Sequence, residues 1–437
     1  MSILNVNKIN PVGGGSTITI AGIASVTSSV TAPSFVGAVT GNVTGNVTGN
    51  VTGDATGLSG NPSINTTGIV TATAFIPSQG QLSHRNILIN GAMNIAQRYA
   101  SSTSHPAYGA DRWRFGFGNH SAGTVTASQQ SLSSSDTPYT LGFRKHIRIA
   151  LGQAGTAASN TYINLRHKIE AQDIAQCGWN YTSSSSFITL QFWFRCSTNQ
   201  TFYAELKSDD GTSQSFVFSF TASGNNTWTK ITKTIPGNSN IQFDNDNGSG
   251  LGLWIYAYFG SGYTNNKTLD TWAPFDSSNY MPTMATTWLT AGASTWDVTG
   301  FQLEVGSVAT PFEHRSAGEE LQRCRRYYQV LVDQAGTSSQ KSFAIACAYS
   351  GSSMHSTHLL SPEMRAVPTL DYTTGSNYYR AYYNGTSDQY DQMVIVGNSH
   401  ANAVDIMVSS GLSVTQGNAV LCRTHNAASK IAFTAEL

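Results

Sequence analysis

The densest group of residues that could recognise a ligand lies near the carboxyl end of the chain, on either side of Asn384-Gly385. An Asn-Gly pair between two β-like segments is typical of a tight hairpin turn. The group combines tyrosine rings, an arginine and two carboxylates, and its members are Tyr378, Arg380, Tyr382, Asp388, Tyr390 and Asp391. Flat rings beside hydrogen-bond donors and acceptors suit a sugar or a protein loop. We therefore expect ligand binding at this hairpin.

The first strand of the hairpin has two faces of different character. Because side chains alternate along a strand, Tyr378, Arg380 and Tyr382 share one face. The opposite face carries Tyr379, Ala381 and Tyr383. We interpret the face with the arginine as outward and the face with the alanine as inward. Packing in the core or at a subunit interface is the alternative, and we prefer it for the inward set only.

Hydrolysis of a polysaccharide would need two carboxylates at a fixed separation across a cleft. The candidate carboxylates are Asp111, Glu170, Asp173, Glu205, Asp209, Asp210, Asp270 and Asp276. Most of them lie in expected turns or on single strands, and the sequence alone cannot bring any two of them together. The Gly-x-Ser-x-Gly motif of a serine nucleophile does not occur either. We expect no enzymatic activity and no catalytic residue.

Metal-ligating patterns are isolated. His355 and His358 would project from opposite faces of a strand, and Cys422-x-x-His425 has no second ligand pair nearby. The segment 244–248 is rich in Asp and Asn, but its twelfth position is Ile255 instead of the glutamate of a calcium-binding EF-hand loop. We expect no metal and no other cofactor, and an Asx-rich turn at 244–248, with structural calcium as the open alternative there.

Charge is scarce in this chain. Only 11% of the residues are charged, against roughly 25% in typical soluble domains. Lys+Arg and Asp+Glu both number 24, so the net charge is zero. Clustered cations for nucleic-acid binding and an apolar run of about 18 residues for membrane insertion are both missing from the sequence. We expect neither nucleic acid nor a membrane as a partner.

The chain begins without the basic and apolar regions of a signal peptide. Its five cysteines are far apart and not in metal-binding spacing. These features favour synthesis in a reducing cytoplasm, with the cysteines as buried thiols.

A Gly-Asn-Val-Thr repeat occupies residues 41–57. In a strand, Gly, Val and Ala would face one side and Asn and Thr the other. In a helix, each turn would carry a glycine that costs about 0.5–1 kcal/mol, so the repeat favours a strand. A face of Val and Gly buries too little apolar surface to be stable alone. We therefore expect 36–83 to be an extended β-stalk shared by identical strands of several subunits.

From His84 onward the pattern is that of globular β-structure. The expected strands are 187–196, 201–207, 216–220, 230–235, 251–259 and 297–305. In 254–259 both alternating faces are apolar or aromatic, which indicates an inner strand covered on two sides. The spacing predicts a jelly-roll-like β-sandwich over 84–315.

One helix is expected, over 316–331. Ser316 and Glu319 form a capping-box pattern at its start. Leu321, Cys324, Tyr328 and Leu331 recur at helical spacing. For Arg323, Arg325 and Arg326 we prefer a solvated face, with ion pairs to Glu319 and Glu320 of neighbouring subunits as the alternative. Beyond it, 332–437 returns to short strands and predicts a second β domain.

Several segments of the chain resemble tail-fibre and receptor-binding proteins of bacteriophages, particularly marine phages that infect cyanobacteria. The segments are 4–11 with the repeat after it, 86–94, 110–113, 298–313, 320–328, 362–369 and 432–437. The most specific of them is 298–313, which is similar to the last strand and exit of a module common in such fibres. That module is similar to galactose-binding and other carbohydrate-binding jelly rolls.

The resemblance implies a homotrimeric structural protein of the virion. Its expected parts are a segment 1–35 that anchors the chain to a tail or adaptor protein, the stalk 36–83, the sandwich 84–315, a short helical collar 316–331 and a β-sandwich tip 332–437. The implied function is attachment to a host surface glycan or protein through several weak sites. The alternatives are a virion adaptor or decoration protein without receptor contact, and a tail-spike depolymerase.

Overall fold

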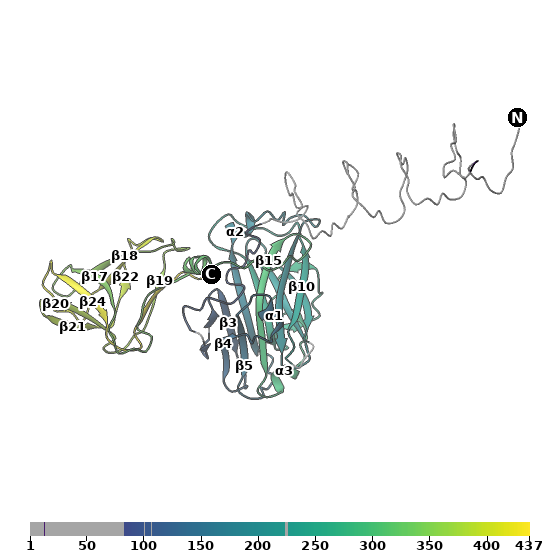
Figure 1. Cartoon of the computed structure of the whole chain (residues 1–437), viewed down its shortest axis with the longest axis horizontal. Coiled ribbons are helices and arrows are strands. Elements are labelled where there is room, and N and C mark those ends of the chain that lie inside the picture. The colour runs from purple at the N-terminus through teal and green to yellow at the C-terminus, as the bar shows by residue number, and fades with distance from the viewer. Residues whose placement is uncertain (1–12, 14–82, 100, 106, 223–225) are drawn as a thin grey trace. The chain divides into compact units, whose positions relative to one another are not determined.

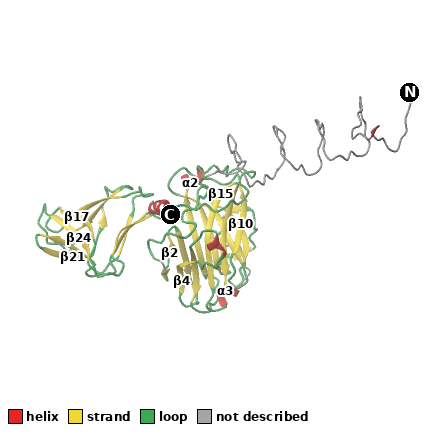
Figure 2. Ribbon diagram, viewed as in Figure 1, coloured by secondary structure: helices red, strands yellow, loops and turns green. Residues whose placement is uncertain are grey.

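The computed structural model describes residues 13, 83–99, 101–105, 107–222 and 226–437. The chain divides into two units, Met1–Thr73 and Ala74–Leu437. The expected anchoring segment 1–35 and the stalk 36–83 lie outside the described residues, except for Gly13 and Ser83. The described part of the second unit is built mainly from strands, which confirms the mostly β fold class (Figures 1 and 2).

Two antiparallel sheets, named A and B here, form the sandwich expected over 84–315. In spatial order, sheet A contains β1 (Ser101–Ser102), β4 (Val125–Ser131), β5 (Lys145–Leu151), β15 (Thr295–Val305), β7 (Phe187–Cys196) and β10 (Thr229–Pro236). Sheet B contains β13 (Trp272–Pro274), β9 (Gln214–Thr221), β8 (Thr201–Ser208), β11 (Ser249–Phe259), β6 (Tyr162–Glu170), β3 (Trp113–Gly118) and β2 (Ala107–Ala110). The jelly-roll-like sandwich is therefore confirmed.

All six strands expected in this region are present. Strand β7 has the expected bounds, and the other five begin and end within two residues of them. Shorter elements connect the sheets: β12 (Thr264–Asn265) paired in parallel with β14 (Met281–Pro282), α1 (Thr137–Thr140), α2 (Ala171–Ala175) and α3 (Thr287–Thr290).

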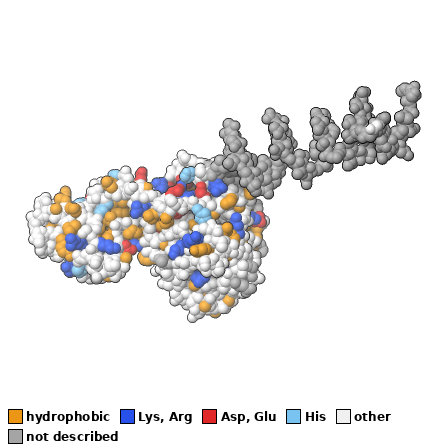
Figure 3. Space-filling model, viewed as in Figure 1, with side chains coloured by type: hydrophobic (Ala, Val, Ile, Leu, Met, Phe, Trp, Pro, Cys, Tyr) orange, Lys and Arg blue, Asp and Glu red, His pale blue; other side chains and the backbone are white. Residues whose placement is uncertain are grey.

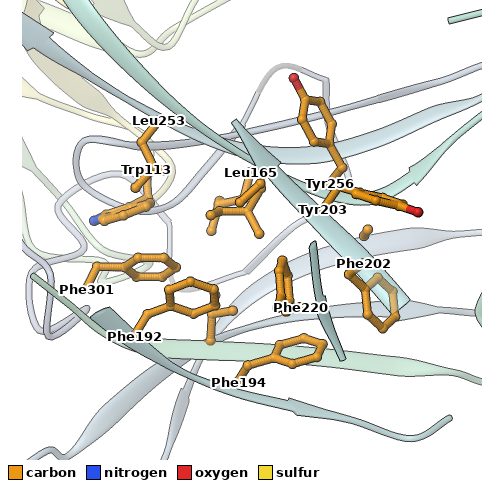
Figure 4. Packing of buried hydrophobic residues seen from close by; sticks show 14 of the residues in the cluster. Trp113, Leu165, Phe192, Phe194, Phe202, Tyr203, Phe220, Leu253, Tyr256 and Phe301 are labelled. Atoms are coloured by element: carbon orange, nitrogen blue, oxygen red, sulfur yellow. The ribbon is translucent and has the colours of Figure 1, made fainter. Parts of the chain in front are cut away.

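Large aromatic side chains join sheet A to sheet B (Figure 4). Phe192 of β7 and Phe301 of β15 stack with their ring centroids 4.8 Å apart. From sheet B, Phe220 meets Phe192 and Phe194 edge-on at 5.3 and 5.0 Å. Burying each such ring contributes about 1.5–3 kcal/mol to folding. This core holds sheet B in place, and with it the side chains on the opposite face of sheet B.

Helix α4 (Ala317–Arg325) begins as expected and ends early. The Ser316 hydroxyl oxygen accepts a hydrogen bond from the Glu319 backbone N–H at 3.2 Å, which confirms the cap. Strand β16 (Tyr328–Asp333) follows almost at once, so the prediction of a helix up to 331 was wrong. Tyr328 instead pairs with Thr434 in a sheet and is 1% exposed. Tertiary burial of this ring outweighs its helical spacing.

Two more sheets, D and E, form the carboxyl-terminal part. Sheet D contains β16, β25 (Lys430–Thr434) and β19 (Thr369–Tyr372). Sheet E contains β21 (Thr386–Tyr390), β20 (Tyr379–Tyr383), β24 (Ala419–Thr424), β17 (Ser342–Ala348), β18 (Met354–Leu359), β23 (Ala403–Val408) and β22 (Val394–Ile395). Buried side chains of both sheets form one hydrophobic cluster.

Two of the three arginines at α4 and its end, Arg323 and Arg326, form ion pairs with glutamates of the same chain. Arg326 donates to both carboxylate oxygens of Glu170 at 2.6 and 2.7 Å, and Glu170 is fully buried. Arg323 pairs with Glu319 of the same helix at 3.1 Å. The expected solvated face therefore fails for Arg326, which holds a buried carboxylate.

The visible surface of the described residues is mostly uncharged, with lysines, arginines and acidic residues in small scattered groups (Figure 3). Among those residues, no helix has the length and apolar character needed to cross a membrane.

Candidate functional site

A pocket of about 290 Å³ lies on the face of sheet B that points away from the core. We name it the sheet B pocket. Its lining is aromatic, basic and amide-bearing, and consists of His105, Arg114, Gly116, Tyr162, Asn164, Arg166, Trp254, Phe259, Tyr263 and Tyr280. Among the described residues, no aspartate and no glutamate lines it.

The pocket floor is formed by neighbouring strands in register. Arg114 of β3 lies opposite Arg166 of β6, and Arg166 lies opposite Trp254 of β11. On β6, Ile163 and Leu165 are fully buried in the core. Because side chains alternate along a strand, the residues between and beside them point into the pocket. One row across three strands thus carries two guanidinium groups and an indole.

Arg166 lies over the face of Trp254, with its guanidinium carbon 4.8 Å from the ring centroid. Both side chains are half-buried. This cation–π contact fixes the orientation of both groups, which leaves the guanidinium donors and the exposed part of the indole available to a ligand.

Two glycines of β3 allow side chains of β6 to lie close to the backbone. A Cβ atom on Gly118 would be 2.7 Å from the ring of Tyr162, and one on Gly116 would be 3.2 Å from Oδ1 of Asn164. Asn164 is 5% exposed, with its amide among the pocket-lining groups. The glycines therefore shape the floor of the pocket.

The wall of the pocket is a group of aromatic rings. Tyr162 is 6.3 Å from Phe259 between ring centroids, and Phe259 is 5.1 Å from Tyr263 and 5.3 Å from Tyr280. Burial, followed by the charges of Glu205 and Tyr263, raises the pKa of Tyr280 above its usual value. The Tyr280 hydroxyl is therefore neutral at physiological pH and can donate a hydrogen bond.

His105 at the edge of the pocket is neutral. Its Nδ1 atom accepts a hydrogen bond from the Phe117 backbone N–H at 3.1 Å. The ring proton therefore sits on Nε2, which lies 3.3 Å from the Tyr162 hydroxyl. Burial and then the charge of Arg114 lower the pKa of His105. This histidine can act as a hydrogen-bonding group without adding charge at neutral pH.

The hairpin expected around Asn384-Gly385 is present. β20 and β21 pair in register, and both turn residues have positive φ, 45° and 74°. On the outward face, Arg380 lies opposite Arg423 of β24, and the Arg423 guanidinium lies 5.1 Å from the Tyr382 ring centroid. The Tyr382 hydroxyl donates to Gln340 at 2.9 Å. A hollow beside the turn is also lined by Tyr382, and the outward set stays a predicted binding surface.

Tyr390, Asp388 and Asp391 do not join this outward set. Tyr390 is 2% exposed and pairs with buried Tyr379, so it belongs to the core. The turn sets this register, and cross-strand partners share a face. Asp388 lies opposite Ala381 and accepts hydrogen bonds from the Tyr383 hydroxyl and the Ser413 N–H.

Asp391 accepts a hydrogen bond from the Tyr378 backbone N–H at 3.0 Å. Its carboxylate therefore fixes the local backbone at the start of the hairpin. The six residues therefore do not form one surface: Arg380 and Tyr382 lie on the outward face of β20, and Tyr378 is partly buried and packs against the core cluster.

Most of the carboxylates considered for catalysis make structural contacts, and Glu205 and Glu170 are two examples. Glu205 is fully buried and accepts a hydrogen bond from the Tyr256 hydroxyl, and burial raises its pKa. Burial also favours a raised pKa at Glu170, but hydrogen bonds from Arg326 and Tyr327 outweigh it and lower the pKa. The lack of enzymatic activity stays a prediction.

Metal-ligand groups are not assembled within the described part of the chain, where no cluster of three His, Cys, Asp or Glu residues could hold an ion. The Asx turn at 244–248 is confirmed, since Asp246 Oδ1 accepts the Gly248 N–H at 2.8 Å. His355 pairs with Asp405 at 2.9 Å while His358 is buried on the other face of β18. The five cysteines form no disulfide, and the expectation that all are buried fails for exposed Cys347.

The sheet B pocket was missed at the level of sequence. The alternation of Tyr162, Asn164 and Arg166 with Ile163 and Leu165 was the available signal for a strand with a polar outward face. Trp254 was expected in a strand covered on both sides. The strand is central in sheet B, yet Trp254 is half-buried and lines the pocket.

No protein-family model and no curated protein sequence matches this chain. Among solved structures, the enzymatically active domain of bacteriophage CBA120 tailspike protein 4 is similar at a TM-score of 0.27 and 8% identity, covering 50% of this chain and 21% of that chain. The match therefore spans about a fifth of that tailspike chain.

Two smaller structures are similar over nearly their whole length. TmCBM61 in complex with beta-1,4-galactotriose gives a TM-score of 0.24 at 10% identity, covering 50% of this chain and 97% of that chain. The family 11 carbohydrate-binding module from Clostridium thermocellum in complex with a beta-1,3-1,4-mixed-linked tetrasaccharide gives 0.23 at 9% identity, covering 49% and 100%. Likeness at these values assigns the chain to none of these groups.

Proposed function

We propose that this protein is a phage tail-fibre subunit that attaches the virion to a bacterial surface by binding carbohydrate, with the sheet B pocket as a sugar-binding site. The observation that carries the sugar-binding part is the row of Arg114, Arg166 and Trp254 beside buried Asn164. The phage part rests on the sequence resemblance, above all on 298–313. The protein acts by binding and not by catalysis.

The chemistry of the pocket suits a short stretch of glycan. Aromatic rings such as Trp254 offer flat apolar surface to the C–H face of a sugar, while guanidinium and amide groups bond its oxygens. Its volume of about 290 Å³ is at the lower end of ligand pockets, which run from about 300 to 1,000 Å³. Since no described residue that lines the pocket is a carboxylate, the lining does not supply the pair that a retaining or inverting glycosidase uses.

The proposal includes a homotrimer, which multiplies several weak sites into firm attachment. The outward face of sheet E supports self-association, because it exposes large apolar side chains. Ile345 on β17 is 76% exposed, Leu359 on β18 is 85% exposed, and Tyr349 just after β17 is 71% exposed. Apolar surface gathered in this way is typical of a face that another chain covers.

The test is binding of the full chain to an array of bacterial surface polysaccharides and to cyanobacterial cells. We expect Trp254→Ala to reduce binding at least about tenfold. Trp193→Ala is the matched control, because Trp193 is a half-buried tryptophan that lines a different hollow, on sheet A. It should bind like the unchanged protein.

Two outcomes would overturn the proposal. Absence of binding to every glycan and cell type would favour the adaptor or decoration protein. Release of reducing sugars from a bound polysaccharide would favour the depolymerase.

A further inference from the structure

We infer that the sheet B pocket selects an acidic glycan, one whose carboxylate or sulfate group is held between Arg114 and Arg166. This inference rests on the proposed sugar-binding function and names the class of sugar. It is carried by the two adjacent guanidinium groups and by the pocket lining, in which no described residue contributes a carboxylate.

The two arginines are placed as a pair. Arg114 and Arg166 are direct cross-strand partners on β3 and β6, and both line the pocket. Side chains in such positions have Cβ atoms about 4.5–5.5 Å apart, and like charges there are destabilising. Neither arginine forms an ion pair or a side-chain hydrogen bond with a described residue, so the repulsion is not relieved within that part of the chain.

The nearby carboxylates are already engaged. Asp209, just after β8, pairs with Lys168 at 3.0 Å and with Lys207 at 3.1 Å. Glu205 lies opposite Trp254 but is fully buried with the Tyr256 hydroxyl donating to it.

Glu436 pairs with Arg98 and Arg112, and Arg112 lies just before β3, two residues from Arg114. Among the described residues, the two cations at this pocket therefore have no ion-pair partner.

An anion on a sugar ring would complete this arrangement. Guanidinium groups bind carboxylate and sulfate oxygens through paired N–H donors, and such charge-assisted bonds are stronger than neutral ones. The neighbouring Trp254 offers its ring to the sugar face, and Asn164 offers an amide to its hydroxyls. A nucleic acid fits less well, because its backbone calls for a track of cations, and the other lining groups are neutral.

The experiment measures affinity of the full chain for chemically matched pairs of polymers by isothermal titration calorimetry. One pair is polygalacturonate and its methyl-esterified form, in which the carboxylates are blocked. The other is dextran sulfate and dextran. We expect at least about tenfold tighter binding of one acidic member than of its neutral partner. Tighter binding of polygalacturonate identifies a carboxylate as the ligand group, and tighter binding of dextran sulfate identifies a sulfate.

Variants assign the preference to the arginines. Arg114→Gln and Arg166→Gln should each abolish the preference for the acidic polymer, whereas the lysine variants should retain part of it. Arg144→Gln is the control of equal charge change, because Arg144 donates to backbone carbonyls of Tyr139 and Phe143 and lies over the Tyr139 ring, outside the residues that line the pocket. It should keep the full preference, and thermal unfolding of each variant shows that the fold is intact.

The contradicting outcomes separate this inference from the proposed function. Equal, Trp254-dependent binding of acidic and neutral polymers would overturn the inference and leave the sugar site standing. Absence of binding to all four polymers, together with an empty glycan array, would overturn both. If single-stranded DNA binds more tightly than all four polymers, and the glutamine variants lose this binding, the ligand of the pocket is a nucleic acid and not an acidic glycan.

Discussion

Single residues on β6 and β3 decide what the sheet B pocket can hold. Along β6, alternation sends Ile163 and Leu165 into the core and leaves Asn164 and Arg166 at the pocket. On β3, Gly118 lets the ring of Tyr162 lie against the strand, because any Cβ atom would stand 2.7 Å from it. The glycine at position 118 therefore helps to set the shape of the pocket, as the polar residues set its chemistry.

Gly118→Ala should weaken glycan binding while leaving the fold stable. The new methyl group displaces the end of a flexible tyrosine side chain, which costs little in folding free energy but moves the pocket wall. We expect a loss of affinity of about threefold to tenfold in calorimetry and an unchanged midpoint of thermal unfolding. Unchanged affinity would show that the Tyr162 ring takes no part in binding.

Acid should destabilise the protein through its buried histidines. Burial, with Arg195 and Arg148 nearby, lowers the pKa of His146 to about 4, although Asp297 acts in the opposite direction. Burial and Arg112 hold the pKa of His167 well below its usual value. In the unfolded chain both have a pKa near 6.5, so between pH 6.5 and 4 the unfolded state binds more protons and stability falls as pH falls.

Urea unfolding at pH 7, 6 and 5 measures this effect. His146 alone should account for a loss on the order of 3 kcal/mol by pH 4, most of it below pH 6. His146→Asn should flatten the dependence. A free energy of unfolding that stays constant from pH 7 to pH 5 would contradict the assignment.

The strands of the sandwich and the start of α4 were predictable from local sequence patterns. The end of α4 depends on pairing between segments that are distant in sequence. Strand β7 and the cap at Ser316 follow from alternation and from capping chemistry. The end of α4 could not be predicted in this way, because Tyr328 pairs in a sheet with Thr434, which is far away in sequence. A helical spacing cannot reveal a partner that lies in another segment.

The pocket escaped prediction for the same reason. Arg114, Arg166 and Trp254 come from three separate strands, and only the register of sheet B makes them neighbours. The hairpin was predictable because its turn is local, and the same local register then showed that Tyr390 is core. Alternation in the sequence predicts which side chains share a face of a strand. A site formed by several strands can be predicted only when the pairing register of the sheet is known.

Helix α4 should respond to changes at its first turn. Ser316→Ala removes the hydrogen bond to the Glu319 N–H and should reduce the free energy of unfolding by about 1 kcal/mol. Gly318→Ala is the matched alanine substitution at a site with no atom within 4 Å of the new Cβ, and it should raise stability by up to about 1 kcal/mol. Urea unfolding measures both, and equal effects of the two variants would refute the cap.

The proposed trimer would carry several copies of a weak binding site on one molecule. For an open pocket of about 290 Å³ we expect weak binding of a glycan by each single copy. Repetition of the pocket in three copies would lengthen attachment without any new contact. The repeat at 41–57 and the apolar face of sheet E are the two features that favour such copies.

Sedimentation equilibrium of the full chain should give three times the monomer mass. Ile345→Glu with Leu359→Glu should lower the oligomer's stability, because each places a charge on the face that we expect to be covered. Val308→Glu, at a 65% exposed position outside sheet E, is the control and should leave the mass unchanged. A monomer mass for the unchanged chain would refute the shared stalk.

The most direct test of the central claim is a crystal structure of the chain with the glycan that binds best on the array. We expect a sugar ring packed against Trp254, with its acidic group between Arg114 and Arg166. A sugar bound only at the outward face of the hairpin, near Arg380 and Tyr382, with the sheet B pocket filled by water alone, would contradict it.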